Sequence, residues 1–108
     1  MIDTPSLSIE SMRAAAKDAT SMLRTLANPD RLLLLCQLSQ GEKSVGELEQ
    51  LLDIAQPTLS QQLGVLRQEN LVATRRVGKQ IYYSVNDPKV LILLNQLYAL
   101  YCGGEGDK

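Results

Sequence analysis

The chain has 108 residues and a formal net charge of −1, and it contains no histidine, phenylalanine or tryptophan. This length fits a single domain over residues 1–108, with a small core built from leucine, valine, isoleucine, methionine and alanine. Without histidine, nucleophilic catalysis by a Ser/His or Cys/His pair is excluded, and no phosphate-binding glycine loop is present, so we expect no enzyme and no cofactor.

The first residues lack the basic-then-apolar pattern of a secretory signal, and no apolar run is long enough to span a bilayer. We therefore expect a cytoplasmic protein with no membrane partner. In that compartment two cysteines are not expected to form a permanent disulfide. Two cysteines with scattered carboxylates are also too few soft ligands for a closed zinc site within one chain, so no metal site is predicted.

An amphipathic helix is predicted from about Ser8 to Leu26, after a mobile segment over residues 1–7. Its apolar side chains alternate three- and four-residue steps, and they are Ile9, Met12, Ala16, Ala19, Leu23 and Leu26. Such a stripe fits either the core or a dimer interface. Both interpretations remain open, because a small leucine-rich helical protein often completes its core by dimerising.

A second helix is predicted after Asn28, which can cap it, with Pro29 in the first helical position. The helix ends near Gly41 and is apolar on almost all sides. We therefore expect it in the middle of the domain, with Cys36 in or beside the core.

A third, short helix opens with a capping box, since the Ser44 hydroxyl and the Glu47 carboxylate can each accept a backbone N–H of the other residue. This helix ends near Leu52, and a tight turn leads into a fourth helix, which is the spacing of a helix-turn-helix. In the fourth helix, leucines at i, i+4 and i+7 define one buried face: Leu59, Leu63 and Leu66.

The opposite face of the fourth helix carries small or hydrogen-bonding groups without a negative charge, and a basic hairpin follows it. Residues 71–74 and 80–85 suit strands, and residues 75–79 between them hold three cations around a glycine. This layout predicts a winged helix-turn-helix, whose helix enters the major groove of double-stranded DNA while its wing lies along phosphates. Candidate contacts to base edges or nearby phosphates are Gln56, Thr58, Ser60, Gln61 and Gln62, and those of the wing are Arg75, Arg76 and Lys79.

The distribution of charge agrees with this interpretation. Residues 1–55 carry a net charge of −3, residues 56–80 carry +3, and residues 81–108 carry −1. Cations are therefore concentrated where phosphate contact is predicted, although an ordinary solvated hairpin would look the same on charge alone.

A fifth helix is predicted after Asn86–Pro88, which supply a cap and a first-turn proline, and it continues to Tyr101 and Cys102. Two glycines end it, and residues 103–108 are expected to be mobile. The predicted fold class is mainly α, a winged helix-turn-helix of five helices with a small β-hairpin. Cys102 is expected to be exposed at the helix end, and the residues alone leave open whether the two cysteines are inert or functional.

Three stretches of the chain resemble the ArsR/SmtB family of bacterial winged-helix repressors. They are Leu26–Leu32 with its Asn-Pro-Asp-Arg, Glu47–Arg67 with its Gln-Pro-Thr-Leu-Ser-Gln-Gln-Leu, and Arg75–Tyr83. The resemblance covers about residues 10–102. It implies a homodimer joined through the first and last helices, which binds operator DNA until an inducer relieves repression.

The familiar metal sites of that family are missing, because Ser44 and Gly46 stand where many members have a Cys-x-Cys pair and no histidine is present for the last helix. One cysteine after Asn28-Pro29 and one ending the last helix are similar to the BigR/SqrR branch, which responds to sulfide-derived persulfides. In that branch a disulfide or polysulfide bridge joins the two thiols and the repressor leaves its DNA. The resemblance implies that Cys36 and Cys102 are the redox-sensing pair, that reactive sulfur species are the inducer, and that sulfide detoxification genes are controlled.

Ala55 departs from the family, which often has a capping serine there, and loss of that cap would weaken the recognition helix by ~1 kcal/mol.

The alternatives are a repressor with inert cysteines, one with a metal or a general oxidant as inducer, and a thiol redox enzyme. The absence of a CxxC motif argues against the enzyme.

Overall fold

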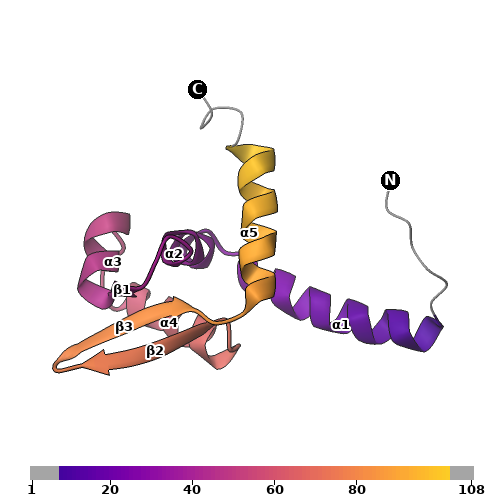
Figure 1. The fold of residues 1–108 in the computed structure, drawn as a ribbon, viewed down its shortest axis with the longest axis horizontal. Helices are drawn as coiled ribbons and strands as arrows, with labels where there is room; N and C mark the ends of the chain where they lie inside the picture. Colours follow the sequence, from indigo (N-terminus) through magenta and orange to yellow (C-terminus); the bar gives the residue numbers. More distant parts are fainter. Residues whose placement is uncertain (1–7, 103–108) are drawn as a thin grey trace.

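The computed structural model describes residues 8–102, which form a winged helix-turn-helix of five helices and a three-stranded sheet. In chain order the elements are α1 (Ile9–Leu26), α2 (Pro29–Leu38), β1 (Lys43–Ser44), α3 (Val45–Leu52), α4 (Thr58–Gln68), β2 (Val72–Val77), β3 (Gln80–Val85) and α5 (Pro88–Tyr101). Helices α2, α3 and α4 gather beside the sheet, while α1 and α5 extend away from this group in different directions (Figure 1). The predicted fold class is confirmed, and the predicted mobile ends at 1–7 and 103–108 lie outside the described residues.

Three of the predicted helix starts are capped as expected. The Asn28 Oδ1 accepts the backbone N–H of the third residue of α2 at 3.0 Å, and Asp87 accepts a backbone N–H at the start of α5 at 2.9 Å. In the capping box of α3, the Ser44 hydroxyl accepts the N–H of Glu47 at 3.2 Å, and the Glu47 carboxylate accepts the N–H of Ser44 at 2.8 Å. These bonds satisfy N–H groups that a helix start otherwise leaves unpaired.

Helix α4 starts differently from the expectation for position 55. It begins at Thr58 with Pro57 as its N-cap, and this cap makes no side-chain hydrogen bond. Ala55 lies earlier in the turn, where its carbonyl accepts the N–H of Leu59 at 3.0 Å. The assignment of Ala55 to the cap position is therefore wrong, although the helix does lack a side-chain cap.

The sheet contains one strand that the sequence did not indicate. Its order is β1-β3-β2, and β1 consists of only two residues, which is too short to show an alternating pattern. The hairpin is also longer than predicted, because β2 continues to Val77 and pairs with β3 up to Gln80. The loop is therefore only Gly78 and Lys79, with Gly78 at φ +60°, a conformation that glycine adopts without steric cost.

The core lies where α2, α3 and α4 meet the sheet and the start of α5. Its fully buried side chains are Leu34, Leu35, Leu48, Leu59, Leu63, Leu66 and Val90. The three leucines predicted for the inner face of α4 are among them. Helix α2 lies at the centre, as predicted, but Cys36 is exposed and therefore lies beside the core and not in it.

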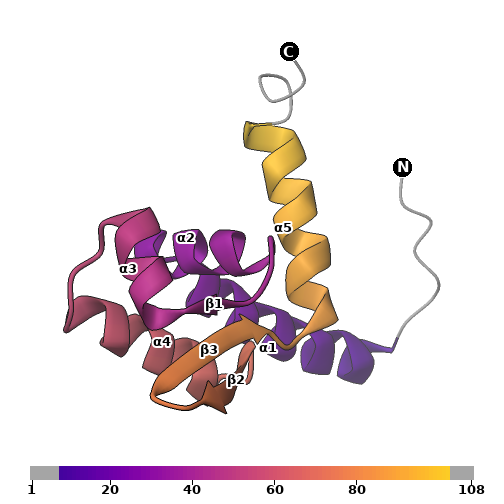
Figure 2. The same ribbon diagram turned by 60° about the vertical axis from the view of Figure 1, so that its left-hand side comes forward.

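The two outer helices leave much of their apolar surface uncovered. In α1 only Thr25 and Leu26 are buried, while Ile9, Met12 and Leu23 are exposed. Figure 2 shows α5 rising clear of the rest of the molecule, and its second half carries exposed Tyr98, Leu100 and Tyr101. Within residues 8–102, no helix combines the length and the apolar character needed to cross a membrane.

Candidate nucleic-acid interface and cysteine pair

The outer face of α4 presents uncharged hydrogen-bonding groups to solvent. The buried leucine stripe fixes the rotation of the helix, so Thr58, Ser60 and Gln61 are exposed together. Gln56 lies just before the helix, and its Oε1 accepts a hydrogen bond from the Ser60 hydroxyl. Hydroxyls and amides in this arrangement can pair with base edges or phosphates without charge repulsion from DNA.

Gln62 differs from its neighbours because it is half-buried and already has a partner. Its Oε1 accepts a hydrogen bond from the Arg31 guanidinium of α2 at 3.0 Å. This residue was predicted together with the outward-facing set, and the structure separates it from them. Its carbonyl oxygen is engaged inside the molecule.

The cations of the wing lie on different faces of the hairpin. Arg75 pairs with Tyr82 in the β2–β3 register and Arg76 pairs with Ile81, and successive residues of a strand project to opposite faces. Arg76 is exposed, and its Nε donates to the Gly78 carbonyl at 3.3 Å. Lys79 is exposed in the loop, so Arg76 and Lys79 together surround the end of the hairpin.

Arg75 is held by a carboxylate. Its Nε and one terminal nitrogen donate to the two oxygens of Glu42 at 2.9 and 2.7 Å, which is a bidentate pair. The guanidinium lies 5.4 Å from the centroid of the Tyr82 ring. The hydrogen bond from Arg75 holds the pKa of Glu42 below its ordinary value. The positive charge of Arg75 is therefore neutralised locally.

Arg31, Glu42 and Tyr82 are the residues of this surface that the sequence did not reveal. Arg31 and Gln62 are 31 residues apart, and Glu42 and Arg75 are 33 apart, so no helical or strand periodicity relates them. The one signal in the sequence was Glu42, an acidic residue directly before Lys43. Only the folded sheet brings it near the basic strand β2.

The two cysteines belong to neighbouring helices. A groove of about 590 Å³ runs between α2 and α5, and it is lined by Cys36 with Leu94, Asn95 and Tyr98 of α5, among others. Cys102 follows one turn after Tyr98, whose carbonyl accepts the Cys102 N–H at 2.7 Å. Both cysteines are exposed free thiols.

The environment of Cys36 disfavours its thiolate form. Partial burial raises the pKa of the Cys36 thiol, and the nearby Cys102 raises it further. Cys36 lines the groove with Tyr98, and Cys102 lies one turn after Tyr98, so the fold places the two cysteines at the same groove. Within residues 8–102, no three side chains of the metal-binding types lie together in a way that could hold a metal ion.

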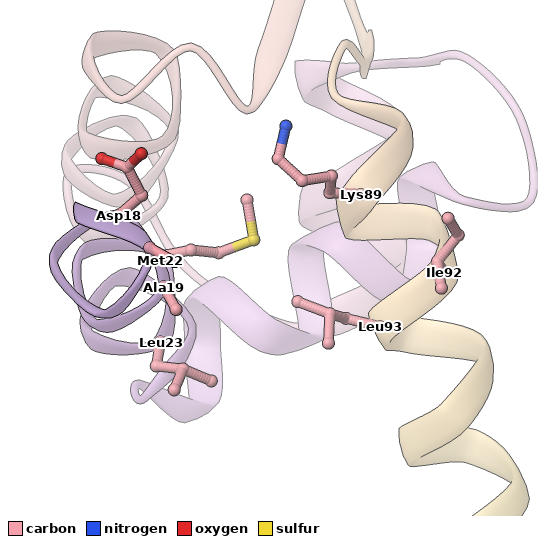
Figure 3. Close-up of a pocket in the computed structure, with 8 residues that line it drawn as sticks. Asp18, Ala19, Met22, Leu23, Lys89, Ile92 and Leu93 are labelled. Carbon is pink, nitrogen blue, oxygen red and sulfur yellow. The ribbon is translucent and has the colours of Figure 1, made fainter. Parts of the chain in front are cut away.

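A second groove, of about 540 Å³ and almost wholly apolar, lies between the outer helices. Ala19, Met22 and Leu23 of α1 face Ile92 and Leu93 of α5 across it, with the Met22 side chain extending toward α5 (Figure 3). Asp18 and Lys89 stand at its edge. An open apolar groove continuous with exposed helix faces is typical of a protein–protein contact.

The comparisons with known proteins agree on one family. Residues 28–74 match the sequence pattern described as "Bacterial regulatory protein, arsR family". The chain is 50% identical over 104 residues to the biofilm growth-associated repressor of Agrobacterium fabrum, and the match covers 96% of this chain and 89% of that protein.

Solved structures show the same similarity. The crystal structure of the transcriptional repressor BigR from Xylella fastidiosa superimposes with a TM-score of 0.83 at 50% identity, over 89% of this chain and 98% of that one. A structure described as reduced HlyU from Vibrio cholerae gives a TM-score of 0.83 at 36% identity, over 87% of this chain and 99% of that one.

Proposed function

Because this chain belongs to the arsR family of bacterial regulatory proteins and is a BigR-like transcriptional repressor, we propose that it binds operator DNA as a homodimer and leaves it when Cys36 and Cys102 become linked. Reactive sulfur species are the proposed inducer, and sulfide detoxification genes are the proposed targets. The observation that carries this proposal is the occurrence, in one BigR-like chain, of two free thiols on neighbouring helices beside a winged helix-turn-helix.

In the proposed complex α4 enters the major groove and the end of the wing lies on the backbone. The exposed groups Gln56, Thr58, Ser60 and Gln61 then meet base edges or nearby phosphates, and Arg76 and Lys79 meet phosphates or the minor groove. Arg75 joins them only by exchanging its carboxylate partner for a phosphate. Gln62 offers DNA its NH₂ group alone while its carbonyl accepts from Arg31.

The proposed dimer is joined through α1 and α5. Both helices expose large apolar side chains, and the groove between them has an apolar lining that a second copy of the chain can cover. Two-fold symmetry then gives two recognition helices, which suit a pseudo-palindromic operator whose half-sites lie about one helical turn apart.

The proposed sulfur chemistry proceeds in two displacements. A cysteine thiolate attacks the sulfane sulfur of a persulfide RSSH, forming Cys–S–SH and releasing RS⁻. The second thiolate attacks the inner sulfur of Cys–S–SH, forming Cys–S–S–Cys and releasing HS⁻. The two thiols are oxidised and the sulfane sulfur is reduced to sulfide. If both cysteines are first persulfidated, their condensation gives a trisulfide bridge and H₂S.

The bridge would connect α2 to the far end of α5, because Cys36 lies in α2 and Cys102 ends α5. A direct disulfide requires Cα atoms within about 7 Å, and each additional sulfur relaxes that limit. To release the operator, the bridge must favour the non-binding arrangement over the binding one by about 5 kcal/mol. A free-energy difference of this size converts an almost fully bound population into an almost fully free one. One relative, HlyU from Vibrio cholerae, was solved in a form described as reduced.

The test follows binding to a DNA duplex selected by the wild-type protein from a random library. Fluorescence anisotropy is measured before and after treatment with a polysulfide donor, and intact mass is read on the same samples. We expect release of DNA together with a mass that corresponds to a bridge between Cys36 and Cys102, and recovery of binding after reduction.

The variants Cys36→Ser and Cys102→Ser provide the controls. Each should bind DNA as the wild type does and should stay bound after treatment with the donor. If the wild type stays bound although both cysteines are modified, the cysteines are inert as a switch and the inducer lies elsewhere. If a divalent metal releases the DNA while the polysulfide donor does not, the chain is a metal-responsive repressor that uses carboxylates or thiols shared between subunits as ligands.

A further inference from the structure

We propose that Arg31 is a positioning residue that sets the orientation of the recognition helix α4 relative to the outer helix α1, acting through Gln62. The inference rests on the proposed function, since its main readout is operator binding. It assigns Gln62 a role inside the protein in place of a base contact.

The Arg31 guanidinium bonds to two other helices at once. Its Nε donates to the Thr25 carbonyl at 2.6 Å and its Nη2 donates to the Arg24 carbonyl at 3.4 Å, both in the last turn of α1. Its Nη1 donates to the Oε1 of Gln62 in α4 at 3.0 Å. Arg31 is itself fixed, because its backbone N–H is the group that Asn28 caps at the start of α2.

The bond to the Thr25 carbonyl satisfies an acceptor at the end of α1, where carbonyls lack partners within the helix, and the guanidinium places a positive charge at the negative end of α1. That role alone would need only a cation. The bond to Gln62 needs a third donor at a fixed angle, which the planar fork of arginine provides and the single ammonium of lysine does not.

Gln62 sits at the edge of the core face of α4. It is half-buried, whereas Gln61 beside it in the sequence is exposed. Among the side-chain hydrogen bonds of residues 8–102, the one from Arg31 is the one that reaches α4 from another element. A tilt or rotation of α4 must therefore either break the hydrogen bond between Arg31 and Gln62 or move the Arg31 side chain, which is also bonded to α1.

This arrangement has a consequence for the dimer. Helix α1 belongs to the proposed dimer contact and α4 to the proposed DNA contact, so Arg31 connects the surface that sets the separation of the two subunits to the helix that reads each half-site. A rearrangement of α1 would reach α4 through this residue.

The test compares Gln62→Met, which keeps the length of the side chain and removes the acceptor, with Arg31→Lys and the double variant. The matched control is Gln68→Met, at an exposed glutamine that ends α4 and has no proposed DNA contact. Binding is measured on the duplex selected by the wild-type protein, on a set of duplexes with single base-pair substitutions, and on a scrambled duplex. Hydrogen–deuterium exchange is measured on the free proteins.

We expect Gln62→Met and Arg31→Lys each to weaken specific binding by about tenfold, the order of one hydrogen bond to a charged group. The double variant should lose no more binding affinity than the single variant with the larger loss. The loss should be equal on every substituted duplex, with an unchanged salt dependence, and the amides of α4 should exchange faster while those of α3 do not.

A loss confined to one base pair of each half-site, with no effect of Arg31→Lys, would make Gln62 a base contact and overturn the inference. Additive losses, or exchange in α4 that both variants leave unchanged, would overturn it as well. If the wild type binds no duplex more tightly than the scrambled one, the proposed function fails, and the exchange measurement still decides whether Arg31 and Gln62 hold α4.

Discussion

The winged unit, α2 through β3, and the outer helices α1 and α5 use the same kinds of apolar residue and bury them to very different extents. In the winged unit, Leu59, Leu63 and Leu66 are at most 1% exposed. On the outer helices, Ile9 is 63% exposed and Leu100 is 74% exposed. The winged unit therefore completes its core within one chain together with Leu26 of α1 and Val90 of α5, while the rest of the outer helices displays apolar surface that a single chain leaves uncovered.

This difference shows that periodicity predicts which face of a helix is apolar but not what covers it. The stripe of α1 was compatible with the core or with a dimer interface, and within one chain it is mostly exposed. We therefore expect substitutions in the winged unit to act on folding, and those on the outer helices to act on association.

The largest expected effect comes from the core of the winged unit. Leu63→Ala should lower the free energy of unfolding by roughly 2–5 kcal/mol, because it leaves a cavity beneath the recognition helix. Denaturant unfolding measures the change. Leu51→Ala, at a position 53% exposed, is the matched control and should change the free energy by no more than about 0.5 kcal/mol. Equal losses in the two variants would contradict the described core.

Introducing a charge on the outer helices should separate the proposed dimer into single chains. Ile92→Glu places a carboxylate at an apolar groove and should convert the protein to a species of half the mass in sedimentation. Binding to an inverted repeat should weaken by roughly 100-fold through loss of bivalency, while binding to an isolated half-site stays unchanged. Gln40→Glu adds the same charge outside the outer helices and should keep the original mass. If Ile92→Glu also keeps it, α5 does not join the subunits.

A matched pair of helix caps sharpens the comparison at a smaller scale. Ser44→Ala should cost about 1 kcal/mol of unfolding free energy, because it breaks the capping box of a helix that packs into the core. Ser8 caps α1 by accepting the N–H of Ser11 at 3.0 Å, but that end of the helix is exposed. Ser8→Ala should therefore leave global unfolding unchanged and speed amide exchange only in the first turn of α1. If Ser8→Ala lowers the unfolding free energy as much as Ser44→Ala does, the contrast between the winged unit and the outer helices is wrong.

The smallest expected effect concerns the cations. Arg76→Ala should reduce the slope of log affinity against log salt concentration by about one unit for each bound subunit, with similar weakening on all DNA sequences. Arg13→Ala removes an equal charge from the exposed surface of α1 and should leave the slope unchanged. A slope that Arg76→Ala does not alter would remove the end of the wing from the DNA contact.

Much of the fold could be predicted because its signals are local. Asn28, Ser44 and Asp87 mark helix starts within a few residues, and the leucines of α4 mark its inner face by their spacing. The two-residue strand β1 was missed because it has no period of its own and forms only by pairing with β3. Cys36 was expected in or beside the core, and it lies beside the core because the face of α2 that carries it is open toward α5.

The candidate site was predictable at the level of which segments take part, and less so at the level of individual side chains. The sequence identified the helix and the wing from composition and charge. It could not show that Gln62 turns inward to Arg31 or that Arg75 is paired with Glu42, because those contacts join residues more than thirty positions apart. Such contacts depend on the packed arrangement of helices and strands and not on neighbouring residues.

If the chain binds an operator as proposed, the pairing of Arg75 with Glu42 has a consequence for how quickly it finds that operator. A repressor searches a large excess of unrelated DNA, and each free cation lengthens its residence on every random segment. With Arg75 occupied by Glu42, the wing in the proposed complex would meet unrelated DNA with Arg76 and Lys79 alone, so those encounters would be shorter. In the proposed complex, a phosphate would displace Glu42 where α4 fits the operator and holds the wing against the backbone. The carboxylate would thus weaken binding to unrelated DNA and speed release from it.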